Sequence, residues 1–283
     1  MKSNKIVKYL RCPCCKGEMR VSDDEKTLFC LGERKHCFDF SSKGYVNLAG
    51  VRGITGDSKQ AVRSRTDFLN KGYYSPIAEK LVDILSRYIP DGIVVDAGCG
   101  EGYYTSKIAE KGYDTIGLDL SKYAVDTLSS RLHCKTNNST LAVVSSIYEM
   151  PFCDSFANAV VSIFAPCAED EILRVLSDNG FLIVVSAGAE HLMGLKEALY
   201  ENVYTNDTRA DMPNGMELVY RENLKFSITL ENNTDVMNLF SMTPYYWRTS
   251  PEDSKKLCNI NTLKTTVDIN FLVYKKMINK ETL

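Results

Sequence analysis

The sequence has no long apolar run and no repeat. Its longest apolar stretches lie around Ala159–Phe164 and Phe181–Val185, far short of the roughly 20 residues that a membrane-spanning helix needs. The basic N-terminus lacks the apolar region of a secretory signal. No internal repeat or low-complexity tract is present. We therefore expect a cytoplasmic globular protein without a membrane partner.

Disulfides are not expected either, because a chain without an export signal keeps its thiols reduced. The sequence nevertheless contains 10 cysteines, and five of them lie between Cys12 and Cys37. Such clustering in a reduced protein favours a metal site. A segment of about 40 residues buries little core, so a bound metal would supply the missing stability.

Charge is unevenly distributed along the 283 residues. The net charge is −2, but residues 1–72 carry 15 Lys and Arg against 8 Asp and Glu, whereas the remainder is acidic. A basic front half is typical of binding to a polyanion by one end of the molecule. Random variation of the surface charge is the alternative interpretation.

The middle of the chain alternates strand and helix patterns. Such alternation predicts an α/β fold with a parallel sheet covered by helices on both faces. Asp57 or Ser58 would cap a helix that runs toward Gly72. The expected strands lie at 93–98, 113–121, 141–146, 159–166 and 181–187, and the expected helices at 77–88, 102–111, 122–132 and 172–180.

A glycine-rich loop follows the first of these strands and opens a helix. It reads Val95-Asp96-Ala97-Gly98-Cys99-Gly100-Glu101-Gly102. Glycines allow a tight turn and a close approach of a ligand to the backbone, and the helix N-terminus offers free N–H groups. A pyrophosphate or a nucleoside could bind there, so a dinucleotide oxidoreductase is the nearest rival.

Acidic residues favour the nucleoside. Asp96 lies inside the loop, where it would repel pyrophosphate but could bind near a cationic amino-acid tail. Asp119 ends the next strand, from which a carboxylate can hold both ribose hydroxyls. The third strand ends in Ser145 and Ser146, and a hydroxyl or backbone group there could meet an adenine.

The N-terminal cysteines fit tetrahedral zinc. Cys12 and Cys15 form a C-x-x-C pair, and Cys30 and His36 supply two further ligands. Cys37 competes with His36 for the fourth position, and the side chain of Cys14 should point away from the turn. Four protein ligands leave no open coordination position, so we expect a structural role.

Together, the loop and Asp119 resemble the class I, Rossmann-like S-adenosylmethionine methyltransferases. The resemblance implies S-adenosylmethionine as cofactor, with Gly98 in the loop that cradles its methionine part and Asp119 on its ribose. It also implies a seven-stranded sheet whose last strand is antiparallel. The strings KFSITLEN and TTVDINFLVYKK beyond residue 200 would supply the remaining strands.

A narrower resemblance covers about Cys12 to Phe271. The strings CPCC, HCFDF, KGYVNL, FLNKGYYSPI, DAGCGEGYYT, IYEMPF, IFAPC, EHLMGLKEALYENV and MTPYYW occur in order. The chain thereby resembles the bacterial 23S rRNA guanine-N1 methyltransferases of the RlmA type. The resemblance implies zinc at the four residues named above and cofactor contacts at Tyr74, Gly100, Glu101 and His191. It divides the chain into a zinc-binding module (1–40), a linker and helix (41–72) and a methyltransferase domain (73–283).

The implied reaction joins the methyl group to N1 of a guanine in a 23S rRNA hairpin. Orientation of the two reactants is then the main task of the protein, and a paired guanine would have to be extruded. We expect Phe164 to stack on the base, and the backbone carbonyls of the strand end that includes Ala165 and Pro166 to accept its N1 or N2 proton. A small-molecule methyltransferase and a non-enzymatic zinc-containing RNA-binding protein are the alternatives. The sequence leaves open which guanine is modified and whether the protein is a monomer or a homodimer.

Overall fold

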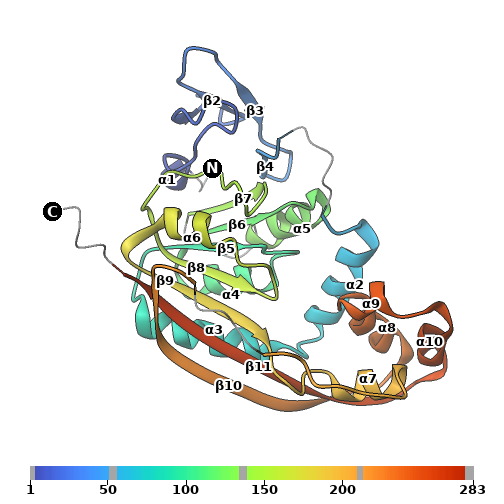
Figure 1. The fold of residues 1–283 in the computed structure, drawn as a ribbon. Coiled ribbons are helices and arrows are strands. Elements are labelled where there is room, and N and C mark those ends of the chain that lie inside the picture. The colour runs from blue at the N-terminus through green and yellow to red at the C-terminus, as the bar shows by residue number, and fades with distance from the viewer. Residues whose placement is uncertain (1–3, 51–55, 134–138, 209–212, 278–283) are drawn as a thin grey trace.

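The computed structural model describes residues 4–50, 56–133, 139–208 and 213–277. A small sheet near the N-terminus lies at one end of a large sheet that is flanked by helices (Figure 1). The small sheet contains β1 (Met19–Val21), β2 (Thr27–Cys30) and β3 (Cys37–Asp39), preceded by α1 (Asn4–Val7). In the described parts of the chain, no helix is long and apolar enough to cross a bilayer.

The large sheet has eight strands in the order β10-β11-β9-β8-β5-β6-β7-β4. Every neighbouring pair from β9 to β4 is parallel, and β11 is antiparallel to both of its neighbours. The strands are β4 (Val46–Asn47), β5 (Ile93–Ala97), β6 (Asp114–Asp119), β7 (Thr140–Val144), β8 (Ala157–Ile163), β9 (Leu176–Ala187), β10 (Met216–Leu230) and β11 (Leu263–Lys276).

The α/β class and the antiparallel strand near one edge are confirmed, with one addition. Seven strands match the expected sheet, and the two strings beyond residue 200 lie in β10 and β11. The eighth strand, β4, comes from the N-terminal part of the chain and pairs with β7 through two residues. Its pattern is too short to be recognised in a sequence, since two residues carry no periodicity.

Helices cover both faces of the large sheet. Val94 and Val95 are adjacent in β5 yet belong to different buried clusters, because successive side chains of a strand point to opposite faces. One cluster includes α3 and α4, and the other includes α1 and α6. The helices are α2 (Lys59–Asn70), α3 (Ser75–Tyr88), α4 (Tyr103–Lys111), α5 (Lys122–His133), α6 (Glu169–Val175), α7 (Met193–Leu199), α8 (Asn233–Ser241), α9 (Tyr245–Arg248) and α10 (Pro251–Lys256).

The helix expected at 172–180 is wrong in its second half. Helix α6 ends at Val175, and β9 begins at Leu176. Leu176 is fully buried and pairs with Ala157 of β8. Burial and strand pairing outweigh the short helical pattern, because propensity is a weak prior against tertiary contacts.

The N-terminal segment packs directly on the large sheet. Leu10 forms a bridge with Phe152, and the backbone N–H of Arg11 donates to the carbonyl of Pro151. Leu10 and Phe152 are buried in the same cluster as Val95 of β5. The small sheet and the large sheet therefore share one hydrophobic core.

Candidate functional site

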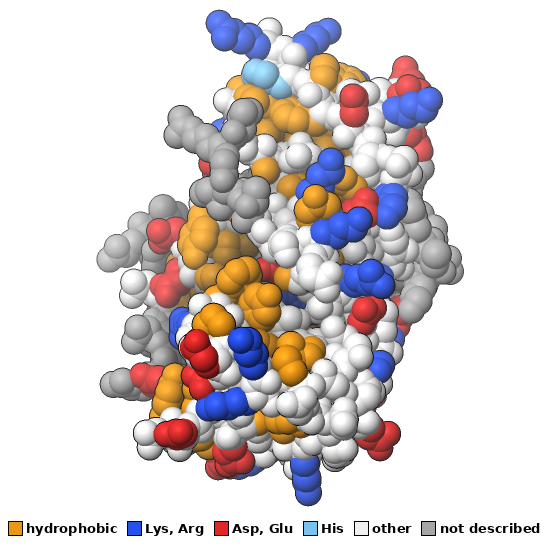
Figure 2. Space-filling model, turned by 90° about the vertical axis from the view of Figure 1, so that its right-hand side faces the viewer, with side chains coloured by type: hydrophobic (Ala, Val, Ile, Leu, Met, Phe, Trp, Pro, Cys, Tyr) orange, Lys and Arg blue, Asp and Glu red, His pale blue; other side chains and the backbone are white. Residues whose placement is uncertain are grey.

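A cavity of about 1580 Å³ opens at the carboxyl ends of β5, β6, β7 and β8. This edge is where ligands bind in open α/β sheets. Figure 2 shows hydrophobic side chains gathered around a hollow on this side of the molecule. The expected site residues that line the cavity are Tyr74, Asp96, Gly98, Gly100, Glu101, Asp119, Ser146, Phe164, Ala165, Pro166 and His191. The structure thus brings together eleven residues that are widely spaced in the sequence.

The loop after β5 requires its glycines. Gly98, Gly100 and Gly102 all have positive φ, at 81°, 53° and 84°. A Cβ atom on Gly98 would lie 2.7 Å from the Cβ of Ala165, and one on Gly102 would lie 2.3 Å from Leu128. A side chain at any of the three positions would therefore strain the backbone, and one at Gly98 or Gly102 would also collide with a neighbour.

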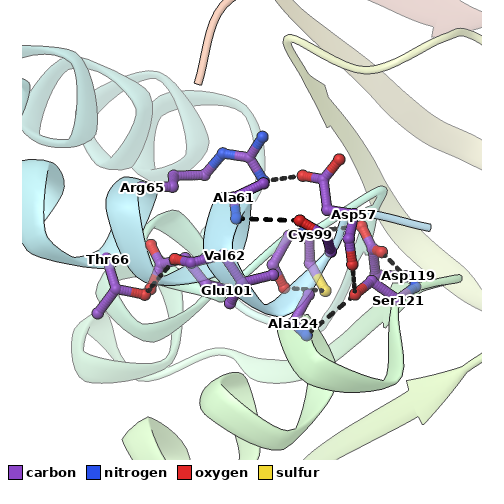
Figure 3. A network of polar contacts seen from close by, with 12 residues as sticks. Asp57, Ala61, Val62, Arg65, Thr66, Cys99, Glu101, Asp119, Ser121 and Ala124 are labelled. Atoms are coloured by element: carbon purple, nitrogen blue, oxygen red, sulfur yellow. Dashed lines mark hydrogen bonds and ion pairs between the residues drawn. The ribbon is translucent and has the colours of Figure 1, made fainter. Parts of the chain in front are cut away.

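Asp119 holds this loop from the end of β6. Its Oδ2 accepts a hydrogen bond from the backbone N–H of Gly100 at 3.0 Å, and its Oδ1 accepts one from Ser121 at 2.8 Å. Burial raises the pKa of its carboxyl group. Figure 3 shows that the Ser121 hydroxyl in turn donates to the carbonyl of Asp57, so the segment before α2 lies against the turn after β6.

Asp96 is buried beneath the loop with one oxygen unsatisfied. Its Oδ2 accepts a hydrogen bond from the Thr105 hydroxyl, while its Oδ1 has no partner among the described residues. Burial raises the pKa of Asp96 to about 7, and the nearby Asp119 adds to the effect. Asp96 lines the cavity, and a buried carboxylate oxygen that lacks a donor fits a cationic ligand group.

Glu101 is engaged within the protein rather than free in the cavity. Its Oε2 pairs with Arg131 of α5, whose Nε lies 2.7 Å away, and it also accepts from Thr66 of α2 at 3.5 Å. The Glu101 side chain is 1% exposed, and burial raises its pKa. Its other oxygen has no partner in the described part of the chain.

We expect Arg131→Met to lower the free energy of unfolding by about 3–5 kcal/mol, because it leaves the buried Glu101 carboxylate unpaired. Denaturant unfolding measures the change. Arg63→Met is the matched control, since the Arg63–Asp67 pair is 77% and 53% exposed and such pairs contribute roughly 1 kcal/mol or less. Similar losses in both variants would contradict a special role for the buried pair.

Three rings form one wall of the cavity. The centroid of Tyr74 lies 6.4 Å from that of Phe164 and 6.3 Å from that of His191, and Phe164 stacks on His191. Tyr74 is buried, whereas Phe164 is 45% exposed and has a positive φ of 52°. The backbone turn after β8 therefore presents the Phe164 ring to the cavity.

His191 is neutral at ordinary pH. Its Nδ1 accepts a hydrogen bond from the backbone N–H of Asp268 at 3.3 Å, which leaves the ring proton on Nε2. Burial lowers its pKa to about 4. The ring can therefore donate one hydrogen bond but carries no charge.

The remaining expected residues are close to the cavity but already make internal bonds. The carbonyl of Ala165 accepts from the Ser162 hydroxyl at 3.2 Å, and the Ser146 hydroxyl accepts from the backbone N–H of Tyr148 at 3.2 Å. These bonds fix the strand ends of β8 and β7. A substrate at these strand ends must therefore bind the lone pairs and N–H groups of Ala165 and Ser146 that these internal bonds leave unused.

Cys12, Cys15, Cys30 and His36 come together in the N-terminal segment. Their ligand atoms all lie within 4.8 Å of one another, and the Nδ1 atom of His36 lies 3.5 Å from the Sγ of Cys12 and 3.4 Å from that of Cys30. The backbone N–H of His36 lowers the pKa of Cys30 to about 6. Three thiols and an imidazole at these distances are a donor set that suits tetrahedral zinc.

Two glycines leave space around this cluster. A Cβ atom on Gly32 would lie 3.2 Å from the Sγ of Cys15, and one on Gly17 would lie 3.4 Å from the same atom. Cys14 and Cys37, the other cysteines nearby, are exposed and lie outside the cluster. Among the described residues, a ligand atom of His36 therefore lies with the three thiols, and the Cys37 thiol does not.

Several residues of the site were not recognised in the sequence. Arg131 and Thr105 lie on helices and look like ordinary helix residues, yet they bind Glu101 and Asp96. The cavity is also lined by Pro13 and Lys16 of the N-terminal segment and by residues 241–245, Trp247 and Arg248. The run of aromatic residues in MTPYYW was the one sequence signal that could have drawn attention to the stretch that begins at Ser241.

Comparisons with known proteins show which proteins the chain is similar to. Residues 95–184 match the family model described as a methyltransferase domain. A Streptomyces fradiae protein named 23S rRNA (guanine(748)-N(1))-methyltransferase is 29% identical over 96% of this chain and 98% of its own length. A Bacillus subtilis protein named "Putative 23S rRNA (guanine-N(1)-)-methyltransferase YxjB" is 27% identical over 98% of this chain and 100% of its own length.

Solved structures are also similar to the chain. The geranyl diphosphate C-methyltransferase of Streptomyces coelicolor, whose structure holds S-adenosyl-L-homocysteine, is 16% identical over 72% of this chain and 76% of its own, with a TM-score of 0.46. The family match over residues 95–184 confirms the resemblance expected from the motifs. The two sequence relatives confirm it over 96% and 98% of the chain.

Proposed function

Because this chain is a class I methyltransferase, we propose that it transfers a methyl group from S-adenosylmethionine to N1 of a guanine in a 23S rRNA hairpin. One observation carries the proposal: the glycine loop, the carboxyl groups of Asp96 and Asp119, and the exposed ring of Phe164 line the same cavity. A donor and a planar base can therefore meet there. The relatives named for this reaction match along both the N-terminal segment and the large sheet.

The donor half of the cavity has a group for each part of S-adenosylmethionine. Asp119 would bind the ribose hydroxyls, and the backbone at Gly98 and Gly100 would approach the methionine part. The unsatisfied oxygen of Asp96 would receive the amino group, and Ser146 would lie near the adenine. When bound, the donor supplies a methyl group on a positively charged sulfur, which needs no further activation.

The acceptor half orients the base. Phe164 would stack on the guanine, with Ala165 and Pro166 along its edge, while Tyr74 and His191 close the wall behind it. The transfer would form the bond from N1 to the methyl group, break the bond from sulfur to the methyl group and release the N1 proton of the guanine, with the backbone carbonyls at the end of β8 as its first acceptors and water as its final one. Proximity and alignment are then the main contribution of the protein, since no covalent intermediate with it is required. The buried Cys99 thiol is therefore not needed as a nucleophile, and burial raises its pKa well above the ordinary value.

Zinc would be held by Cys12, Cys15, Cys30 and His36 in a structural role, because four protein ligands complete its coordination. We retain the division into a zinc-binding module (1–40), a linker and helix (41–72) and a methyltransferase domain (73–283). The basic front half would contact RNA phosphates. A ribosomal RNA substrate implies activity in the cytoplasm.

Affinity for S-adenosylmethionine is expected to fall as the pH drops below about 7. Asp96 has a pKa of about 7 in the free protein, so below that pH its carboxyl group is mostly protonated. The cationic donor favours the carboxylate, so binding releases a proton and weakens by up to about 10-fold per pH unit on acidification. Calorimetry across this range measures the slope. Asp96→Asn should bind weakly at every pH, and an unchanged slope in that variant would contradict the assignment.

Mass mapping of methylated 23S rRNA tests the function. Undermethylated rRNA treated with the protein and donor should gain one methyl group on a guanine within a hairpin, and boiled protein should add none. Calorimetry with S-adenosylmethionine runs in parallel. Donor binding with an unchanged rRNA map would overturn the RNA substrate, whereas no donor binding would favour a non-enzymatic RNA-binding protein. Methylation of free nucleosides alone would indicate a small-molecule enzyme.

A further inference from the structure

An exposed aromatic cluster lies at the rim of the cavity. Tyr148, Tyr204 and Trp247 all line it, with side chains 65%, 67% and 78% exposed. Tryptophan is highly buried on average in folded proteins, so a tryptophan exposed to this degree beside a binding cavity indicates contact with a ligand. These residues come from three separate segments, which the fold brings to one opening.

The backbone that carries Trp247 is firmly held. In α9, Tyr246 packs edge-on against Phe240 of α8 at 5.4 Å and against Trp247 at 5.1 Å. The hydroxyl of Tyr245, on the same helix, donates to Asn206 Oδ1 at 3.2 Å. The exposure of Trp247 therefore belongs to an anchored helix and is not a frayed end.

A buried lysine joins the two sides of this rim. Lys196 of α7 is 2% exposed, and its Nζ donates to the carbonyl of Tyr204 at 2.9 Å and to Asn206 Oδ1 at 2.8 Å. The same ammonium lies 5.2 Å from the ring centroid of Tyr204 and 5.5 Å from that of Tyr245. Lys196 thus acts as a positioning residue for the segment of Tyr204 and for α9.

The size and charge of the site indicate what covers the rim. A small-molecule site usually occupies roughly 300–1,000 Å³, so a cavity of about 1580 Å³ has room beyond the donor. Arg248 follows Trp247, is exposed, and makes no ion pair among the described residues. An aromatic face beside a free guanidinium suits a base and its phosphate.

We propose that Trp247 stacks on an unpaired nucleobase next to the methylated guanine and that Arg248 binds the adjoining phosphate. This inference rests on the proposed function and names the form of its substrate. The rim requires a strand whose bases are unstacked, because a base inside a duplex has no free face to offer. The protein would therefore select a hairpin loop rather than a continuous duplex.

The fluorescence of Trp247 tests the inference directly, because it is the only tryptophan in the chain. The probes are the 23S rRNA hairpin that becomes methylated and a fully paired RNA duplex of the same length, each with S-adenosylhomocysteine present. The hairpin should quench the fluorescence strongly, and the duplex should leave it nearly unchanged even where it binds through its phosphates.

Variants complete the test. Trp247→Ala should raise the KM for the hairpin about 10-fold or more and leave the dissociation constant of S-adenosylmethionine unchanged, whereas Trp247→Phe should restore part of the loss. Tyr123→Ala is the matched control, because Tyr123 is 52% exposed and does not line the cavity. Its KM should equal that of the native protein.

Three outcomes would overturn the inference. The first is that the native protein methylates the hairpin without a change in its fluorescence and that Trp247→Ala keeps the native KM. The second is that Trp247→Ala loses as much affinity for S-adenosylmethionine as for the hairpin, and the third is that the substitution converts a dimer to a monomer. The last would assign Trp247 to contact with a second copy. Failure of the proposed function is a separate result, since it appears as intact donor binding without methyl transfer to any RNA. In that case an RNA hairpin with an unpaired loop replaces the methylated hairpin as the probe, and quenching by it but not by the duplex would still support stacking.

Discussion

We expect Cys30→Ser to abolish the proposed zinc binding and to lower the melting temperature by about 10 °C or more. The substitution removes one of four converging ligand atoms, so the turns that carry the ligands would lose the metal that would link them. Elemental analysis of the purified protein should give one zinc per native chain and close to none per variant. Thermal unfolding followed by circular dichroism measures the change in stability.

Two neighbouring cysteines provide matched controls. Cys14→Ser and Cys37→Ser remove exposed thiols that lie outside the cluster, so both variants should retain zinc and the native melting temperature. Loss of zinc from Cys37→Ser with retention in His36→Ala would reverse the choice of the fourth ligand. Full zinc content in Cys30→Ser would remove the metal assignment.

Asp119→Ala is expected to weaken binding of S-adenosylmethionine about 100-fold or more. Each hydrogen bond to a charged group contributes roughly 1.5–3 kcal/mol, and the carboxylate would bind two ribose hydroxyls. The free protein already uses Asp119 to hold the backbone of Gly100, so the variant would also loosen the glycine loop. Isothermal calorimetry measures the affinity.

Two further variants separate these effects. Asp119→Asn keeps an oxygen that can accept from the Gly100 N–H but loses the negative charge, so its affinity should lie between those of the native protein and the alanine variant. Asp178→Ala removes a carboxylate that is 74% exposed and should bind the donor normally. An affinity of Asp119→Ala within a few-fold of native would contradict the ribose-binding role.

The sequence predicted the frame of this site because its signals are local. The glycine loop, the acid at the end of β6 and the strand–helix alternation each occupy a few consecutive residues. Parallel topology then brings the carboxyl ends of the strands to one edge. The same applies to Cys12 and Cys15, whose spacing alone indicates a metal-binding turn.

The parts that were not predicted depend on contacts between distant segments. Leu176 begins a strand only because Ala157 lies beside it. The pairing of Glu101 with Arg131 spans 30 positions and leaves no local pattern. The exposure of Trp247 likewise follows from how α9 packs on α8, which no periodicity in a four-residue helix can encode.

The shared core between the small and large sheets has a consequence for engineering. Deleting the first 40 residues to obtain a minimal catalytic fragment would strip Leu10 from Phe152 and leave that apolar surface facing water. Pro13 and Lys16 would leave the cavity wall in the same step. Residues 1–40 are therefore part of the folded structure and cannot be removed without damage to it. A protein shortened by these residues would be an aggregation-prone fragment with an incomplete pocket.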